Sequence, residues 1–172
     1  MGAITIKLNG PLGLSAMVDE EDYRTLDLGS YAWRPAIIGQ QTYAVTDNKD
    51  KRIYLHRLIM GLLDAPRSVL VDHIDHNGLN NCRTNLRKTN SSGNQANSRK
   101  HLSAKCSSSY KGVYLCSDKR SNPWQARIKL SGKVKFLGYY KTQEKAALAY
   151  NNAAIEYFGD MAYLNIIEPI KA

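Results

Sequence analysis

Apolar and polar residues alternate over several short runs in the first third of the chain, which is the pattern of half-buried β-strands. These runs are residues 3–8, 14–18 and 31–55. Between the second and third runs, Asp19 lies where a helix N-cap belongs and is followed by further carboxylates, which predicts a short helix through about Leu26. The front of the chain is therefore expected to form small sheets with one short helix.

The last third of the chain shows a second pattern. Three short runs, at residues 110–116, 124–130 and 133–140, are separated by turns and predict three β-strands. A helix is expected to follow from Thr142, which can cap it, to Gly159, which ends it. Closely spaced alanines allow this helix to lie close to the sheet. We expect three strands covered by one helix.

The segment between these regions changes from a β-type run to polar sequence. Residues 69–74 form a β-type run that leads into the polar, glycine-containing stretch 75–85. Residues 89–109 are almost all small, polar or basic, so the first part is compatible with a short helix and the remainder with a linker. The fold class is α+β, and the predicted organisation is a first domain at 1–98, a linker at 99–109 and a second domain at 110–167.

Positive charge is concentrated in one part of the chain. Lys and Arg number 24 against 15 Asp and Glu, a net charge of +9. Residues 1–98 carry a net +1, residues 99–145 a net +10 and residues 146–172 a net −2. Such a bias indicates a polyanionic partner, and nucleic acid is the leading candidate, with a merely solvated basic face as the alternative.

Cysteine content and hydropathy indicate where in the cell the protein is expected. Cys82, Cys106 and Cys116 form no CxxC pair and leave an odd number, which suggests reduced thiols. No apolar run approaches the length of about 18 residues that a membrane span needs. We expect a cytoplasmic protein, in a bacterium or a phage-infected host, with no membrane partner.

Candidate chemistry is densest between Val71 and Leu86, which reads VDHIDHNGLNNCRTNL and holds two Asp, two His and four Asn. A carboxylate beside an imidazole suits phosphodiester hydrolysis. Asp72 can bind a hard cation, and a neutral His73 can take a proton from water. Because adjacent strand residues point to opposite faces, the pair can share a phosphate only where the backbone turns.

This stretch and its neighbours resemble the HNH endonuclease family, particularly its phage and homing-endonuclease branch. The resemblance runs from about Tyr54 to Asn97 through the blocks YLHRLIMG, VDHIDHNGLNN, NLR and NSSGNQAN. It implies a ββα-metal (His-Me finger) nuclease core behind a small β-rich portion. It further implies that the protein hydrolyses DNA with one divalent ion, magnesium or manganese.

The resemblance also implies roles for individual residues. His73 would be the general base, and Asp72 and Asn94 would hold the metal ion, with Asn90 or Asn97 as alternatives to Asn94. Asn85 would tie the loop together. His56 would pack near the site or support it. His76 departs from the family pattern, which commonly has a small residue there, and would contact phosphate or be exposed.

Two features depart from the family pattern or allow another interpretation. The last family position is often histidine, whereas Asn94 offers an amide oxygen, which favours magnesium over zinc. A zinc-stabilised knot is the alternative for the whole block, and its ligands would be His56, His73, His76 and Cys82.

The second domain resembles the Apetala-two (ethylene-response-factor) DNA-binding domain of plants. The blocks YKGVY, WQARI, FLGYYKTQEKAALAYNNAAIEYFG and YLNI follow its order from Tyr110 to Ile166. The resemblance implies that the sheet lies in the major groove of double-stranded DNA. The predicted DNA-binding residues are Lys111, Arg120, Gln125, Arg127, Lys129, Lys133 and Lys135. Lys111 and Arg127 depart from the plant pattern, so base preferences do not transfer.

The sequence thus predicts a site-directed nicking or homing endonuclease of phage origin. Nothing in it indicates a protein partner, and a monomer or weak dimer with one centre would cut one strand per binding event. The alternative from another class is a DNA-binding regulator with a decayed nuclease core. An RNA-directed nuclease ranks last, because few aromatics are expected to interrupt the basic face.

Overall fold

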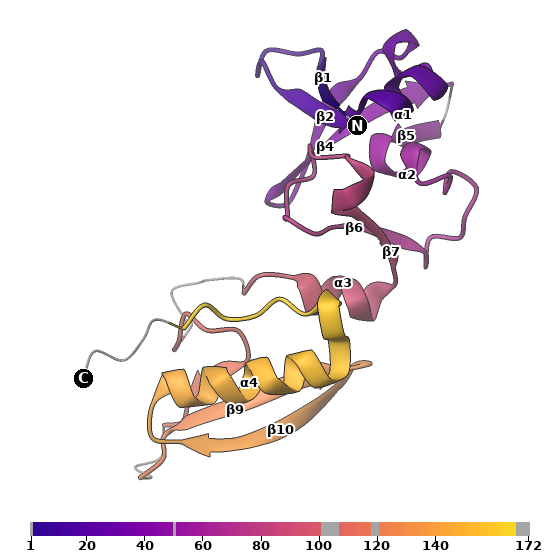
Figure 1. Ribbon diagram of the computed structural model, residues 1–172. Helices are drawn as coiled ribbons and strands as arrows, with labels where there is room; N and C mark the ends of the chain where they lie inside the picture. The colour runs from indigo at the N-terminus through magenta and orange to yellow at the C-terminus, as the bar shows by residue number, and fades with distance from the viewer. Residues whose placement is uncertain (1, 50, 101–106, 118–120, 168–172) are drawn as a thin grey trace. The chain divides into compact units, whose positions relative to one another are not determined.

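The computed structural model of the protein describes residues 2–49, 51–100, 107–117 and 121–167. The chain divides into two units, Met1–Asn90 and Ser91–Ala172, each with small sheets and few helices (Figure 1). The structure is therefore compatible with the predicted α+β class. The division falls before helix α3 (Ser91–Asn97), so α3 belongs to the second unit, whereas the predicted boundary after residue 98 placed it in the first.

The first unit begins with two antiparallel sheets. One contains β1 (Ala3–Lys7) and β2 (Ser15–Asp19), and the other contains β3 (Arg34–Ile38), β4 (Gln41–Asn48) and β5 (Lys51–Tyr54) in the order β3-β4-β5. The alternation predicted from the sequence is present in β2, where Ala16 and Val18 are buried on either side of the exposed Met17. Small strands of this kind bury one face against a shared core.

The region from residue 31 to 55, predicted as β-strands with a turn at 47–50, departs from strand structure at both ends. Trp33 lies before β3 and is buried in the core, where its indole Nε1 donates to the Leu28 carbonyl at 2.9 Å. Leu55 begins helix α2 (Leu55–Ile59) instead of continuing β5. Leu55 and Ile59 are buried in the same core as Trp33, so packing overrides the local alternation.

Helix α1 (Glu20–Thr25) forms where it was predicted, but its cap differs. Asp19 occupies the N-cap position as predicted, but its side chain makes no capping hydrogen bond. Its Oδ2 instead accepts from the Arg83 amide at 2.8 Å. The Asp19 carboxylate is therefore bonded to the first residue of the 3-10 helix η2 (Arg83–Asn85) and not to the N-terminus of α1.

The last elements of the first unit are β6 (Leu70–His73) and β7 (Leu86–Thr89), which pair antiparallel. The long loop between them lies against β2. The Met17 amide donates to the Leu79 carbonyl at 2.8 Å, and the Asn81 amide donates to the Met17 carbonyl at 2.7 Å. The loop is therefore held to the sheet at two adjacent points.

The second unit has the predicted three strands and one helix. Its sheet has the order β10-β9-β8, with β8 (Val113–Leu115), β9 (Trp124–Leu130) and β10 (Lys133–Tyr140). Figure 1 shows α4 (Gln143–Phe158) lying along β9 and β10, and its buried alanines pack on Ala126 and Ile128. The Thr142 side chain accepts from the Lys145 amide at 3.3 Å. The other elements are the 3-10 helices η1 (Leu28–Ser30) and η3 (Gly159–Met161).

Across the described ranges, none of the helices has the length and apolar character that crossing a membrane requires.

Candidate active site

Asp72 and His73 lie at the end of β6, and both residues are only 6% exposed. Neighbouring side chains in an extended strand point to opposite sides. The strand ends at His73, however, and the backbone turns at once, with the His76 amide donating to the His73 carbonyl at 3.1 Å. The local turn that an Asp–His pair needs to serve one phosphate therefore begins directly after the pair.

The Asp72 carboxylate is held by Arg87 on the neighbouring strand. The two residues are opposite each other in the β6–β7 register. Arg87 Nε donates to Asp72 Oδ2 at 2.8 Å, and Nη2 lies 2.7 Å from the same oxygen. Both side chains are largely buried, so the ion pair fixes the orientation of the carboxylate.

His73 is held as a neutral imidazole. Burial lowers its pKa below the usual value, against the opposing effects of the Asn81 hydrogen bond and of the Asp75 and Asp72 charges. His73 Nε2 lies 3.4 Å from Asn81 Oδ1. Because an amide oxygen only accepts, the imidazole proton belongs on Nε2, which makes Nδ1 the basic nitrogen of the ring.

A cluster of four rings includes this imidazole. The ring centroids of His56 and His73 are 5.2 Å apart, edge to face, and the Tyr43 ring lies 5.9 Å from His73 and 5.5 Å from His56. Tyr54 packs on His56 at 5.4 Å. Burial and the nearby His73 and Arg57 charges lower the pKa of His56 to about 3, so His56 is uncharged at neutral pH.

The His56 ring is also short of a hydrogen-bond partner. Within the described part of the chain, no group bonds its buried Nδ1 atom. Its neighbour Arg57 has a structural use, because Nη1 donates to the Val69 carbonyl at 2.8 Å and Nη2 to the Ala65 carbonyl at 3.1 Å. Helix α2 therefore positions both the ring beside His73 and the segment that enters β6.

The loop after His73 is braced by Asn85. Its Nδ2 donates to Asp75 Oδ1 at 2.9 Å and to the Asn80 carbonyl at 2.8 Å, and its Oδ1 accepts from the Asp75 amide at 3.0 Å. Gly78 lies so close to the Thr42 carbonyl that a Cβ atom would not fit. His76 is half-buried with φ +63°, so this loop follows a backbone path that its hydrogen bonds must maintain.

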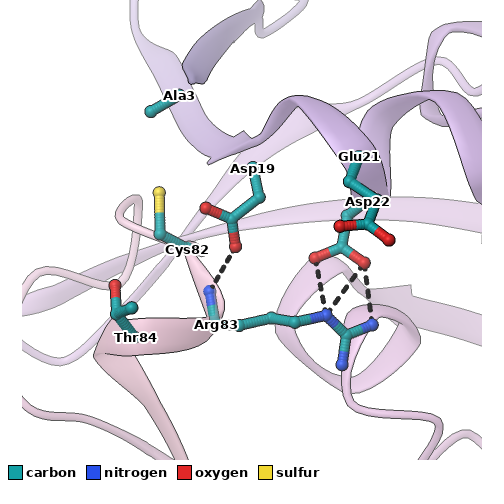
Figure 2. Close-up of a pocket in the computed structure, with 7 residues that line it drawn as sticks. All are labelled: Ala3, Asp19, Glu21, Asp22, Cys82, Arg83 and Thr84. Carbon is teal, nitrogen blue, oxygen red and sulfur yellow. Dashed lines mark hydrogen bonds and ion pairs between the residues drawn. The ribbon is translucent and has the colours of Figure 1, made fainter. Parts of the chain in front are cut away.

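A pocket of about 500 Å³ lies beside this loop, and Figure 2 shows how η2 is attached there. Arg83 Nε donates to the two Asp22 oxygens at 3.0 and 2.9 Å, and Nη2 donates to Oδ1 at 2.7 Å. Burial raises the pKa of Cys82, which keeps the sulfur as a thiol. None of the predicted catalytic residues lines this pocket, so we interpret it as an anchor for the loop.

The predicted metal ligands fall in different units. Asp72 belongs to the first unit, whereas Asn94 and Asn97 lie on α3 in the second. The Asn94 side chain is exposed and that of Asn97 is buried, while Asn90 ends the first unit. The first unit thus brings together Asp72, His73, His56 and Asn85 of the predicted site residues.

The described residues offer no arrangement typical of a zinc site. Among the residues that the structure describes, no group of three or more His, Cys, Asp or Glu side chains is placed to hold a metal ion. The zinc knot of His56, His73, His76 and Cys82 therefore has no matching arrangement there. A carboxylate and an amide oxygen fit magnesium, which keeps several of its waters.

The second unit divides the predicted DNA-binding residues between two faces. Gln125, Arg127 and Lys129 alternate along β9 with the residues that pack on α4, so they share the uncovered face of the sheet. In the register of β10, Lys133 lies opposite Leu130 and Lys135 opposite Ile128. These two lysines therefore do not extend the surface of Arg127 as expected from the sequence, and Lys135 bonds the Tyr157 hydroxyl of α4.

Lys111 makes hydrogen bonds to backbone carbonyls within the second unit. Its ammonium donates to the carbonyls of Gln95, Ala96 and Ser98 at 3.0, 2.7 and 2.6 Å, at the end of α3. Burial lowers the pKa of Lys111 to about 8. This binding mode differs from the exposed phosphate contact that the sequence suggested. Arg120 lies outside the described residues.

Three contributors to the site were not predicted from the sequence. Arg87 belongs to a block that resembles the family but was assigned no role, although its strand position opposite Asp72 could have been inferred from the β6–β7 pairing. Asn81, fully buried, and Tyr43, from a distant strand, carry no local signal of their contact with His73.

Comparison with known proteins identifies two similar proteins. An uncharacterized HNH endonuclease of Acanthamoeba polyphaga mimivirus is 34% identical over 144 residues, which cover 82% of this chain and 70% of the relative. An AP2-like ethylene-responsive transcription factor of Arabidopsis thaliana is 45% identical over 60 residues, 34% of this chain and 17% of that protein. No family model and no solved structure matches. The extent of the viral match shows that this chain belongs to the HNH endonuclease family.

Proposed function

We propose that the protein is a metal-dependent DNA endonuclease that hydrolyses phosphodiester bonds, with His73 as the general base. The observation that carries the proposal is the state of His73: a buried, neutral imidazole whose Nε2 is turned toward Asn81, beside a buried carboxylate held by Arg87. A neutral imidazole with a basic ring nitrogen is what proton abstraction from water requires. The mimivirus relative, named an HNH endonuclease, supports the same class of reaction.

In this mechanism each side chain has a separate task. His73 Nδ1 accepts the proton of the attacking water, while Asn81 keeps the other ring nitrogen protonated. Asp72 and Asn94 would hold one divalent ion, magnesium or manganese. When bound, such an ion supplies positive charge to the scissile phosphate and the leaving oxygen. Asn85 maintains the loop that carries the base.

The second unit would bring the DNA to this centre. Its uncovered sheet face presents Arg127 and Lys129, both exposed, and the surrounding segment 99–145 carries a net +10 charge. The similarity to the plant transcription factor supports an Apetala-two type unit that binds double-stranded DNA. A monomer with one such centre would nick one strand, as expected of a site-directed or homing endonuclease encoded by a phage.

Supercoiled plasmid provides the decisive test. Wild-type protein with magnesium should convert it to the nicked form, and His73→Ala should not, while both bind duplex DNA equally at one salt concentration. Circular dichroism should show that the variant is folded. Absence of nicking by the folded wild-type protein with magnesium or manganese would contradict the nuclease proposal and favour a DNA-binding regulator.

A further inference from the structure

The uncovered face of the second unit's sheet is more apolar than its sequence suggested. In the strand register Tyr114 and Tyr139 lie on either side of Gln125, Phe136 lies opposite Arg127, and Val134 lies opposite Lys129. A break in the register between Phe136 and Gly138 brings Tyr139 to this face. We call Tyr114, Val134, Phe136 and Tyr139 the open-face patch.

The open-face patch is exposed. Its members are 46% (Tyr114), 62% (Val134), 51% (Phe136) and 40% (Tyr139) exposed. Helix α4 covers the opposite face, where Ala126 and Ile128 are buried. A contiguous group of large apolar side chains in water marks an interaction surface.

The charge around the open-face patch specifies the kind of partner. Arg127 and Lys129 lie between its members on the central strand, and both are exposed. The patch therefore faces a partner that offers phosphates and apolar groups together. In the major groove of duplex DNA the one apolar group on the base edges is the C5 methyl of thymine.

Stacking on unpaired bases fits the ring geometry less well. The Arg127 guanidinium lies 5.4 Å from the centroid of the Tyr114 ring, and Lys100 Nζ lies 5.5 Å from it. Phe136 and Tyr139 pack against each other with centroids 4.9 Å apart and planes tilted by 59°. Because stacking on a base needs an open ring face, these rings are better placed to present edges and apolar surface.

Gln125 is poorly placed to read base edges from this face. Gln125 is only 6% exposed, and its Oε1 accepts from Arg127 Nε at 2.6 Å. The amide that would recognise adenine is therefore largely covered and already bonded. Lys129 and the terminal guanidinium nitrogens of Arg127 remain available for phosphates or guanine edges.

We propose that the open-face patch contacts thymine methyl groups in the major groove, so that the second unit prefers thymine-rich duplex DNA. This inference rests on the proposed function, because it assumes that the sheet binds duplex DNA. It adds the bases recognised and the side chains that recognise them.

Removing a single methyl group from the DNA bases tests this inference. Full-length His73→Ala protein, which is not expected to cut, is offered a random duplex pool made with thymine and the same pool made with deoxyuridine, which lacks only the methyl. We expect the bound fraction of the thymine pool to be enriched in A·T pairs. Binding of selected thymine duplexes should weaken about fourfold for each contacted methyl that is removed.

Protein variants provide the matched control. Val134→Ser and Phe136→Ser, made in exposed positions, should abolish the difference between thymine and deoxyuridine duplexes while retaining weaker binding to both. Leu148→Ser, also exposed but on α4, should keep the full difference. Equal reduction by all three variants would overturn the assignment to the open-face patch.

The outcomes separate this inference from the proposed function. If wild-type protein nicks plasmid but the His73→Ala protein binds thymine and deoxyuridine duplexes equally, the methyl contact is wrong and the nuclease stands. Tighter binding to single strands than to duplexes would likewise overturn it in favour of stacking. Failure to bind any duplex together with failure to nick would overturn both.

Discussion

The Asp72–His73 strand end of the first unit and the uncovered sheet face of the second use polar side chains in opposite ways. In the first, carboxylate, imidazole and amide groups are buried and bonded to neighbouring polar groups. In the second, the cations are exposed and apolar rings lie between them. Chemistry on a phosphate needs groups held in one geometry and one protonation state, whereas recognition of a groove needs an exposed surface. Four changes would break or sharpen this comparison.

The largest effect is expected at His73. His73→Ala removes the proposed general base and should lower the single-turnover nicking rate by about a hundredfold to ten-thousandfold. Affinity for duplex DNA should change little, because the residue is buried in the first unit. Lys129→Ala is the matched change on the sheet face and should weaken DNA binding while the rate at saturating protein stays near wild type. The reverse pattern would contradict the division between catalysis and binding.

Arg87→Met tests how far the Asp72 carboxylate depends on its buried partner. Removing the cation leaves Asp72 buried without its ion pair, and the free energy of unfolding should fall by about 3 kcal/mol. Urea unfolding measures this loss. Arg34→Met breaks a solvent-exposed pair with Asp47 in the same unit and should cost far less, because water already screens that pair. Equal losses would show that burial of the Asp72 pair is unimportant.

Lys111→Met tests an ammonium that was predicted to face DNA and instead bonds carbonyls at the end of α3. Loss of these charge-assisted hydrogen bonds should cost roughly 2 kcal/mol of local stability. Amide hydrogen exchange should accelerate in α3, and Lys111→Arg should restore part of the protection. Lys129→Met, at an exposed position, should leave α3 unchanged. Unaltered amide hydrogen exchange of α3 in Lys111→Met would contradict the view that Lys111 stabilises the end of this helix.

A pH dependence of stability is also expected from His56. Its pKa is about 3 in the folded protein and 6.5 in the unfolded chain, so between these values the unfolded chain binds more protons. Stability is therefore complete above pH 6.5 and decreases as pH falls toward 3. His56→Phe keeps an aromatic ring beside His73 and should reduce this acid sensitivity in urea unfolding. An unchanged slope between pH 6.5 and 4 would show that His56 is not buried as a neutral ring.

Local signals were enough to predict much of the second unit. Its three strands end near the predicted turns, and Thr142 and Gly159 bound α4, because alternation, capping and glycine conformations act over neighbouring residues. The same signals misled at Leu55, which looks like a strand residue but starts α2. They placed Asp19 correctly at the N-cap of α1, but they did not indicate that its carboxylate accepts from the Arg83 amide. In both, a partner far along the chain decided the outcome.

For the candidate site, the sequence by itself determined which residue types stand together: Asp72 beside His73, with Asn85 following at the spacing that a loop needs, and a basic segment behind them. Only the tertiary structure decided their states. The partner of Asp72, the protonated nitrogen of His73 and the faces on which Lys111, Lys133 and Lys135 lie all follow from strand register and burial. Strand register and burial depend on contacts between residues that are distant in the chain. Neither the composition nor the spacing of residues specifies those contacts.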